Sequence, residues 1–216
     1  MQLNKGEVID IVWQYSKYYG NQLTFLEQLK SENAVVALIY LTNLLENALL
    51  AYKDDYECNF INVIKFAYKE SLITEVEYKF LNDEQIGIRK LRNYFAHKNL
   101  SKYNFKFPDN DRLYPFTEND NCELFYDLIS NYIFNIICKV ALTSLTISRD
   151  IQQDDLIKKF QYSIVTFTPE DILIDKGIDP TTLTGWNDLK ESDKYRHAEN
   201  ASNIKVLSLI FSHIPQ

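Results

Sequence analysis

Apolar positions recur with helical spacing along most of the first two thirds of the chain. Residues 5–19 carry apolar and aromatic side chains at this spacing and are followed by Gly20, which predicts a helix that ends at the glycine. Residues 21–30 predict a shorter helical or loop segment. Residues 34–52 are apolar almost all round, as is typical of the central helix of a bundle, and residues 60–68 predict a further helix.

A capping signal marks the start of the next predicted helix. Thr74 is followed three positions later by Glu77, which is the spacing of a capping box. The apolar pattern predicts that this helix runs without a break as far as Phe95. Residues 108–117 predict a polar loop, and residues 122–149 predict a long apolar helix.

These elements define a fold class. About five helices joined by short or medium loops predict a mainly α protein whose residues 1–150 form an antiparallel helical bundle. Residues 151–216 differ in character and predict a small C-terminal elaboration. The pattern leaves two readings open, an α+β appendage or an extension packed on the bundle.

The C-terminal third contains shorter signals. Residues 161–168 are rich in β-branched side chains and favour a strand. The sequence Thr168-Pro-Glu-Asp171 predicts a helix start with proline in the first turn, and Gly177 predicts its end. Residues 179–191 are irregular, and residues 203–213 predict an amphipathic helix.

Composition agrees with a folded, helical chain. The 216 residues are 46% hydrophobic and include only 5 glycines and 5 prolines, which argues against disorder and against a turn-rich sandwich. The three cysteines (Cys58, Cys122 and Cys138) show no CxxC spacing, which excludes a paired disulfide framework and a cysteine zinc site. We therefore expect buried free thiols in a reducing compartment.

Two apolar stretches have nearly the length of a membrane span. Residues 34–52 include Glu46 and residues 128–148 include Lys139, so both are interpreted as core helices. The N-terminal residues lack the basic and apolar regions of a secretion signal. We expect a cytoplasmic protein that does not associate with a membrane.

The chain is acidic overall but contains one basic segment, residues 85–108. This segment holds six basic residues and no acidic one, so with a net charge of −7 the rest of the chain carries −13. The six are Arg89, Lys90, Arg92, Lys98, Lys102 and Lys106. The contrast predicts that a polyanion binds this segment rather than the protein at large.

Aromatic residues alternate with the basic ones in this segment. They are Tyr94, Phe95, Tyr103, Phe105 and Phe107. Exposed aromatic rings stack on unpaired bases, which suits single-stranded nucleic acid. The alternative is that the rings belong to the core and the lysines to a solvated face, and for Phe95 we favour this alternative.

Arg92, Asn93 and His97 are the candidate catalytic residues. A histidine exchanges protons near neutral pH and an arginine stabilises charge on a phosphate, so together they suit metal-free cleavage of a phosphodiester. On an ideal helix Arg92 and His97 are about 140° apart, which predicts a helix end or bend at this point, or a site shared between two chains. Asn93 and His97 lie on one face, where the amide can orient the imidazole or bind phosphate.

The motif resembles that of a known family. Arg92-Asn-Tyr-Phe-Ala-His97 is similar to the Arg-x4-6-His signature of HEPN domains, including the polar residue after the arginine. The resemblance implies a HEPN-like bundle and a metal-independent endoribonuclease without cofactors, in which the RNA 2′-hydroxyl attacks the adjacent phosphate. It also implies a homodimer with a composite active site, and a role in toxin–antitoxin or antiviral defence with an antitoxin or regulatory protein as partner. Arg89, Lys98 and Lys102 are then the candidate RNA-binding residues.

The chain departs from one branch of that family. A large toxin group has Arg-x4-His-x-Tyr, whereas this chain has Asn99 in place of the tyrosine, so the modification of that tyrosine by an antitoxin does not carry over. Some HEPN proteins have no nuclease activity. The alternative function is therefore a non-catalytic helical module that binds a protein or a nucleotide. His197 and His213 have no partner at metal-ligand spacing, and we expect no metal site.

A polar stripe on the central helix offers further support for the site. Asn43, Glu46 and Asn47 fall on one face of the predicted helix 34–52. A buried carboxylate is costly unless it is paired, so Glu46 either faces water or contacts a cation such as Arg92 or Arg89.

Overall fold

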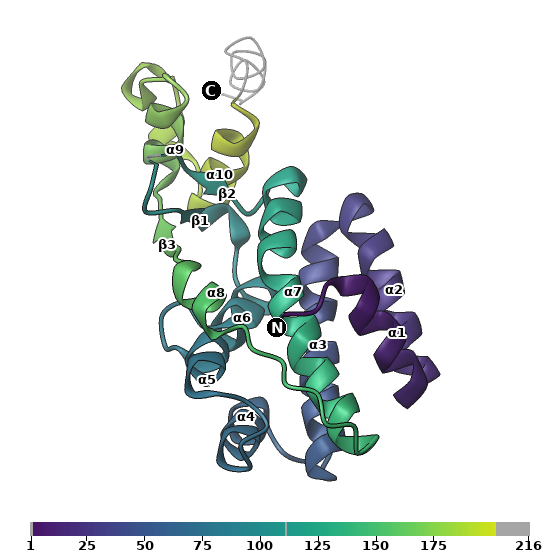
Figure 1. Ribbon diagram of the computed structural model, residues 1–216. Helices are drawn as coiled ribbons and strands as arrows, with labels where there is room; N and C mark the ends of the chain where they lie inside the picture. Colours follow the sequence, from purple (N-terminus) through teal and green to yellow (C-terminus); the bar gives the residue numbers. More distant parts are fainter. Residues whose placement is uncertain (1, 111, 202–216) are drawn as a thin grey trace. The chain divides into compact units, whose positions relative to one another are not determined.

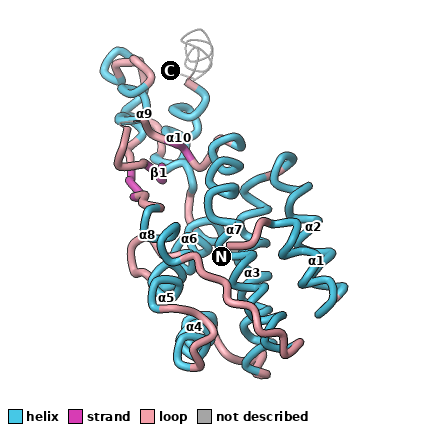
Figure 2. Tube along the Cα trace, viewed as in Figure 1, coloured by secondary structure: helices cyan, strands magenta, loops and turns pink. Residues whose placement is uncertain are grey.

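The computed structural model describes residues 2–110 and 112–201, and the helix predicted for 203–213, together with His213, lies outside this range. The chain divides into two compact units, each made from two segments. Among the described residues, the first unit contains 2–98 and 118–163, and the second contains 99–110, 112–117 and 164–201. Figure 1 labels their elements, and Figure 2 shows that helices account for most of the described chain.

Among its described residues the first unit consists of helices and loops, apart from Ser163 at the start of a strand of the second unit. Its helices are α1 (Lys5–Tyr15), α2 (Lys17–Glu32), α3 (Ala34–Lys53), α4 (Phe60–Lys69), α5 (Glu75–Asn82), α6 (Ile88–His97), α7 (Asn119–Ser144) and α8 (Asp154–Lys159). The prediction of a mainly α protein is confirmed, and so are the helices predicted at 34–52 and 60–68.

Helices α3 and α7 form the centre of this unit because they are apolar on most of their surface. Both are long and apolar enough to cross a membrane, and 56% and 67% of their most apolar stretches are buried inside the fold. Asn135 and Lys139, two polar residues within α7, have hydrogen-bond partners. Asn135 accepts a hydrogen bond from the Leu3 amide at 3.1 Å and donates one to the Leu3 carbonyl at 2.9 Å. These two bonds hold the N-terminal segment beside α7.

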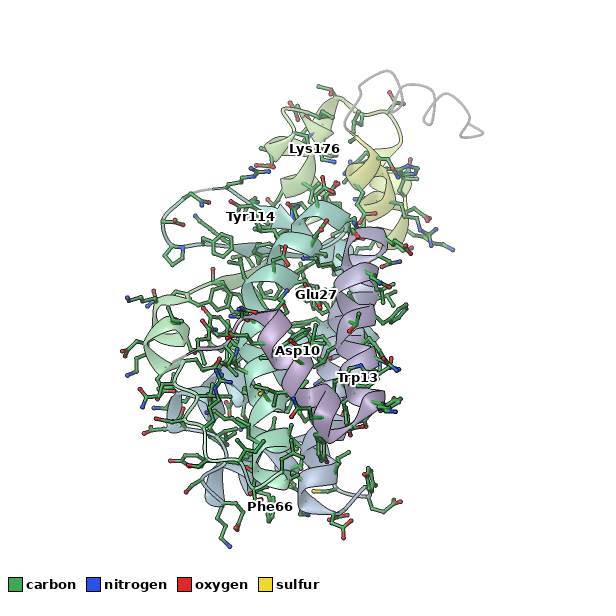
Figure 3. All side chains as sticks on the ribbon, turned by 45° about the vertical axis from the view of Figure 1, so that its right-hand side comes forward. Asp10, Trp13, Glu27, Phe66, Tyr114 and Lys176 are labelled. Atoms are coloured by element: carbon green, nitrogen blue, oxygen red, sulfur yellow. The ribbon has the colours of Figure 1, made fainter. Side chains whose placement is uncertain are left out.

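The prediction that the first helix ends at Gly20 is wrong. Helix α1 ends at Tyr15, Ser16 caps the start of α2, and Gly20 lies buried in the second helix. A Cβ atom at Gly20 would lie 2.2 Å from the Trp13 ring and 3.0 Å from the Trp13 backbone. The glycine is therefore required by close helix packing and not by a helix end (Trp13 is labelled in Figure 3).

The prediction of one helix from Thr74 to Phe95 is also wrong. Its start is confirmed, since Thr74 and Glu77 form the capping box of α5. The chain then turns between α5 and α6, where the Asp83 carboxylate accepts hydrogen bonds from the amides of Gln85 and Ile86 at 2.8 and 2.9 Å. Gly87 permits the turn because a Cβ there would lie 2.5 Å from a backbone atom of Asp83.

The second unit combines a small sheet with two short helices. Strands β1 (Tyr103–Lys106), β2 (Tyr114–Pro115) and β3 (Ser163–Thr166) lie in the order β2-β1-β3, and β1 pairs antiparallel with β2. Helices α9 (Pro169–Asp175) and α10 (Glu191–Asn200) pack around Leu173 and Trp186. The predicted strand and the start of α9 are confirmed, whereas α10 was not predicted.

Gly177 ends α9 as predicted, in a Schellman motif. Its φ is +75°, its amide bonds to the Ile174 carbonyl at 2.9 Å, and the Ile178 amide bonds to the Leu173 carbonyl at 2.8 Å. Lys176 donates hydrogen bonds to carbonyls at the end of α10, including that of Ala198 at 2.9 Å (Lys176 is labelled in Figure 3).

The observed units differ from the expected division into residues 1–150 and 151–216. Residues 151–163 belong to the first unit, because Gln153 bonds to Glu77 at 2.7 Å and Tyr162 bonds to the Ile86 carbonyl. Residues 99–117 belong to the second unit, because they supply β1 and β2 of its sheet. Hydrogen bonds between segments far apart in sequence therefore decide the boundaries.

Candidate functional site

Helix α6 carries the candidate catalytic residues, and its apolar face sets their direction. Ile88, Leu91 and Phe95 are buried at helical spacing and attach the helix to the first unit. Arg92 and Asn93 are half-buried beside this apolar face, and His97 is exposed. Phe95 is 8% exposed, which confirms our interpretation of it as a core residue.

Arg92 lies against the polar stripe of α3. Its Nη2 atom donates to the Glu46 carboxylate at 2.9 Å, and its Nε atom donates to the Asn43 amide oxygen at 3.4 Å. The side chains of Arg92 and Glu46 are 32% and 16% exposed. Of the two alternatives for Glu46, contact with water or with a cation, the structure shows the second, with Arg92 as the cation. Asn47, the third residue of the stripe, is exposed.

The ion pair leaves part of the guanidinium unused. An arginine has five N–H donors, and the bonds to Asn43 and Glu46 occupy its Nε side. Nη1 forms no hydrogen bond with any residue of the described chain. Arg92 is thus fixed in orientation while keeping donors for an anion.

His97 is the last residue of α6. The next residue, Lys98, has φ −111° and ψ 155°, so the chain leaves the helix immediately after the histidine. Arg92 and His97 both lie within α6, so the helix end after His97 leaves them about 140° apart around the helix axis. Within residues 2–110 and 112–201, no hydrogen bond joins Arg92, Asn93 and His97 to one another, and Asn93 is placed on the same face as His97 only by its helical spacing.

The three candidate RNA-binding residues have different surroundings. Arg89 is half-buried and donates from Nε to Asn82 at 2.9 Å, which ties α6 to α5. Lys98 is exposed directly after His97. Lys102 belongs to the second unit, where it pairs with Glu191 at 2.6 Å and lies 5.0 Å from the centre of the Tyr195 ring.

The charge of the basic segment is smaller than its composition suggests. Glu46 offsets the charge of Arg92, and Glu191 offsets that of Lys102 and raises its pKa through their hydrogen bond. The segment is also divided, because residues 85–98 lie in the first unit and residues 99–108 in the second. Acids distant in sequence therefore reduce the local excess of positive charge.

The aromatic rings of the segment are less exposed than stacking on bases requires. Phe95 and Phe105 are buried, whereas Tyr94, Tyr103 and Phe107 are half-buried. Phe105 stacks on Tyr114 with ring centres 4.9 Å apart and forms the core beneath the small sheet (Tyr114 is labelled in Figure 3). The expectation of stacking on bases is corrected for Phe105, because a fully buried ring cannot reach a base.

The structure reveals a buried polar network that the sequence analysis did not predict. Glu77 is completely buried and accepts hydrogen bonds from Lys139 at 2.7 Å, from Gln153 at 2.7 Å and from the Thr74 amide at 2.8 Å. The sequence pattern indicates only a helix-capping role for Glu77. Lys139 in an otherwise apolar helix was the signal, since a lysine there needs a partner.

The described chain contains no reactive cysteine and no cluster of side chains that could bind a metal ion. Cys122 and Cys138 are buried thiols, as predicted, whereas Cys58 is only half-buried, and burial raises the pKa of the Cys122 and Cys138 thiols to about 12 and about 11. Within residues 2–110 and 112–201, no three His, Cys, Asp or Glu side chains lie close enough together to hold a metal ion.

No protein-family profile, curated protein or solved structure matches the chain. The Arg92–His97 motif and the contacts between α3 and α6 are therefore the features from which a function can be inferred.

Proposed function

We propose that the protein is a metal-independent endoribonuclease of the HEPN type, with Arg92 and His97 as catalytic residues and Asn93 in support. One observation carries the proposal: an exposed histidine ends the helix on which an arginine is oriented by Glu46 and Asn43 with donors to spare. An arginine kept 32% exposed and fixed from one side is suited to binding phosphate on the other.

The reaction divides naturally between these side chains. The 2′-oxygen of the RNA attacks the adjacent phosphorus, the bond from phosphorus to the 5′-oxygen breaks, and the products are a 2′,3′-cyclic phosphate and a 5′-hydroxyl. His97 moves protons near neutral pH, and Arg92 stabilises the charge that develops on the phosphate oxygens. No step requires a metal ion or cofactor.

Two copies of the chain suit this chemistry better than one. A proton must leave the 2′-hydroxyl while another reaches the departing 5′-oxygen, and one imidazole cannot do both in a single step. A homodimer with both Arg92–His97 motifs in one composite cleft supplies a base and an acid. In this proposal Lys98, which is exposed beside His97, binds the RNA backbone.

The cellular role follows from the same resemblance. We propose a toxin or effector of a toxin–antitoxin or antiviral defence system that acts on RNA in the cytoplasm. Uncontrolled RNA cleavage is harmful to the cell that produces the enzyme, so its activity must be inhibited. An antitoxin or other regulatory protein is therefore the expected partner.

The test is cleavage of single-stranded RNA in EDTA. We expect the purified protein to leave cyclic phosphate ends, and we expect RNA with 2′-O-methyl groups to remain intact because it lacks the nucleophile. His97→Ala should abolish cleavage without changing the melting temperature, since His97 is exposed, and His197→Ala on α10 is the matched control. Full cleavage by folded His97→Ala, or a requirement for added Mg²⁺, would rule out the mechanism.

A second candidate function is a non-catalytic module that binds a protein or nucleotide. The observation in its favour is that Glu46 already satisfies the charge of Arg92 without any substrate. Wild-type protein that binds RNA or a partner protein and yet leaves RNA intact as a dimer would support this candidate over the nuclease.

A further inference from the structure

The first unit contains a cavity far from the motif in sequence. Its volume is about 790 Å³, within the range of about 300–1,000 Å³ that is usual for small-molecule sites. Its walls come from the turn between α4 and α5, the C-terminal half of α7 and residues 147–158. These residues all belong to the first unit.

The buried network around Glu77 orients one wall of the cavity. Gln153 is 1% exposed, and its Nε2 atom donates to Glu77 at 2.7 Å and to the Tyr132 carbonyl at 3.2 Å. Since both partners are acceptors, the amide can take only one orientation. Its Oε1 atom is buried and has no hydrogen-bond partner in the described chain. It is therefore an unsatisfied acceptor that a ligand N–H can satisfy.

Lys139 supplies the complementary group. Its ammonium has three N–H donors, and both of its hydrogen bonds in the described chain go to the Glu77 carboxylate. Lys139 and Gln153 line the same cavity, so it offers one acceptor and one donor side by side with the network behind them. A secondary amide presents the matching pair, an N–H for Gln153 and a carbonyl for Lys139.

The rim of the cavity carries charges of both signs and an apolar surface. Arg149 lines the cavity, is exposed and forms no ion pair within residues 2–110 and 112–201. Lys158 pairs with Asp155 at 3.9 Å, Asp150 accepts a hydrogen bond from Gln152, and Asp154 accepts one from Thr74. Ile147 and Leu156 also line it and are 45% and 41% exposed. Large exposed apolar side chains beside an unpaired cation are typical of a site for an amphipathic anion.

We propose that this cavity binds a carboxylate that carries a secondary amide and an apolar group, the chemistry of an N-acyl amino acid or of a peptide C-terminus. The amide bonds to Gln153 and Lys139, the carboxylate pairs with Arg149, and the apolar group packs on Ile147 and Leu156. The site lies outside the Arg92–His97 motif, so this proposal does not depend on the proposed nuclease activity.

The cavity is prepared for binding because helix ends hold its walls. Ser71, two residues after the end of α4, has φ 58°, and Thr146, two residues after the end of α7, has φ 55°. In both, the following amide bonds back to the helix, Leu72 to the Ala67 carbonyl and Ile147 to the Leu142 carbonyl, each at 2.9 Å. A preformed wall loses little conformational freedom when a ligand binds.

The test uses hippurate (N-benzoylglycine), which contains the carboxylate, the amide and an apolar ring. We expect saturable binding to the full-length protein by calorimetry, with amide chemical shifts changing in residues 147–156. The methyl ester lacks the charge and the N-methyl analogue lacks the N–H donor, and each should bind about tenfold or more weakly. Both comparisons leave the protein unchanged, so folding does not affect them.

Arg149→Gln should lower the affinity for hippurate by about tenfold or more. The weak affinity for the methyl ester should stay the same, because the ester has no charge for Arg149 to pair with. The matched control is Arg196→Gln, an exposed arginine of the second unit whose loss changes the net charge equally. The peptide acetyl-Ala-Ala-Phe-Gly distinguishes the two sources: tighter binding than hippurate indicates a polypeptide terminus, and equal or weaker binding indicates a small metabolite. Absent binding of hippurate, equal binding of the ester, or unchanged affinity in Arg149→Gln would overturn the proposal.

Discussion

The Glu46 carboxylate on α3 accepts a hydrogen bond at 2.9 Å from Arg92 on α6, although 46 positions separate the two residues. Glu46 is only 16% exposed, so the pair is largely shielded from water while Arg92 remains open on one side. The contact makes Glu46 a positioning residue in the proposed reaction. Glu46 also offsets the positive charge with which Arg92 would attract phosphate. The same contact therefore orients Arg92 and weakens its attraction for RNA.

This opposition leads to a prediction for Glu46→Ala. Without its partner the guanidinium moves freely, and kcat for RNA cleavage should fall about tenfold or more. KM should stay the same or decrease, because a negative charge near the RNA has been removed. Glu46→Gln keeps an acceptor for Arg92 and should recover most of kcat, which a loss of folding would not explain. Steady-state cleavage of single-stranded RNA gives both constants, and wild-type kcat in Glu46→Ala would contradict the positioning role.

The pair of Glu77 and Lys139 predicts non-additive stability changes. Lys139→Met leaves a completely buried carboxylate without a countercharge and should lower the free energy of unfolding by about 3–5 kcal/mol. The double variant Glu77→Met with Lys139→Met should lose less than the sum of the two single losses. Urea unfolding measures all four proteins. Additive losses would mean that the two side chains do not depend on each other.

Gly20→Ala should destabilise the protein even though alanine favours helices. The new methyl group would lie 2.2 Å from the Trp13 ring, so α1 and α2 must separate or Trp13 must move. We expect a net loss of about 1–3 kcal/mol in the free energy of unfolding. Gly6→Ala in α1 is the control, because its methyl group meets only the Asn4 side chain at 3.3 Å. If both variants were equally stable, the contact with Trp13 would not explain the glycine.

The capping box of α9 predicts a stability change that depends on pH. The Thr168 hydroxyl and amide bond to the Asp171 carboxylate and lower its pKa. A lowered pKa in the folded state stabilises the protein above the ordinary aspartate pKa of about 3.9, and this stability is lost as the pH falls through the folded value. Asp171→Ala should therefore cost about 0.5–1 kcal/mol at neutral pH and progressively less in acid.

Thermal unfolding at neutral pH and at about pH 2.5 measures this difference. Asp175→Ala, at the opposite end of the same helix, is the control and should be neutral or slightly stabilising, because an acid is unfavourable near a helix C-terminus. A loss of equal size at both pH values would show that the Asp171 charge is not involved.

Local sequence signals predicted the helix ends that depend on neighbouring residues. The caps at Thr74 and Thr168 and the stop at Gly177 were all confirmed, because each involves hydrogen bonds within a few positions. The signal failed at Gly20, where glycine also suits a close approach between helices. The break before Gly87 was missed because apolar residues continue on both sides of the turn.

Helix α10 was not predicted because its apolar pattern is weak. Helix α10 buries only Tyr195 and Ala198 and is mostly polar elsewhere, so its apolar spacing is too sparse to recognise. Its place is set by contacts from other segments. The Tyr195 hydroxyl bonds to the Phe167 carbonyl at 2.7 Å, and Trp186 packs against Ala198.

The candidate site was predicted in part. The cost of burying a charge left two alternatives for Glu46, contact with water or with a cation, and the helical rotation left a helix end, a bend or a site shared between two chains near His97. The charge of the segment around them was overestimated. Glu191 lies 89 positions from Lys102, and no local pattern indicates that the two side chains pair at 2.6 Å.

The sequence by itself determined that this chain is mainly helical, where its apolar helices lie and which residues form the Arg92–His97 motif, because periodicity and capping act over a few positions. The tertiary structure decided which charges are offset, which aromatic rings are buried and where the units divide. It also decided that Gln153 and Lys139 meet at one cavity. Those outcomes depend on side chains far apart along the chain, whose energies are set by burial and by the partners that folding brings within hydrogen-bonding distance.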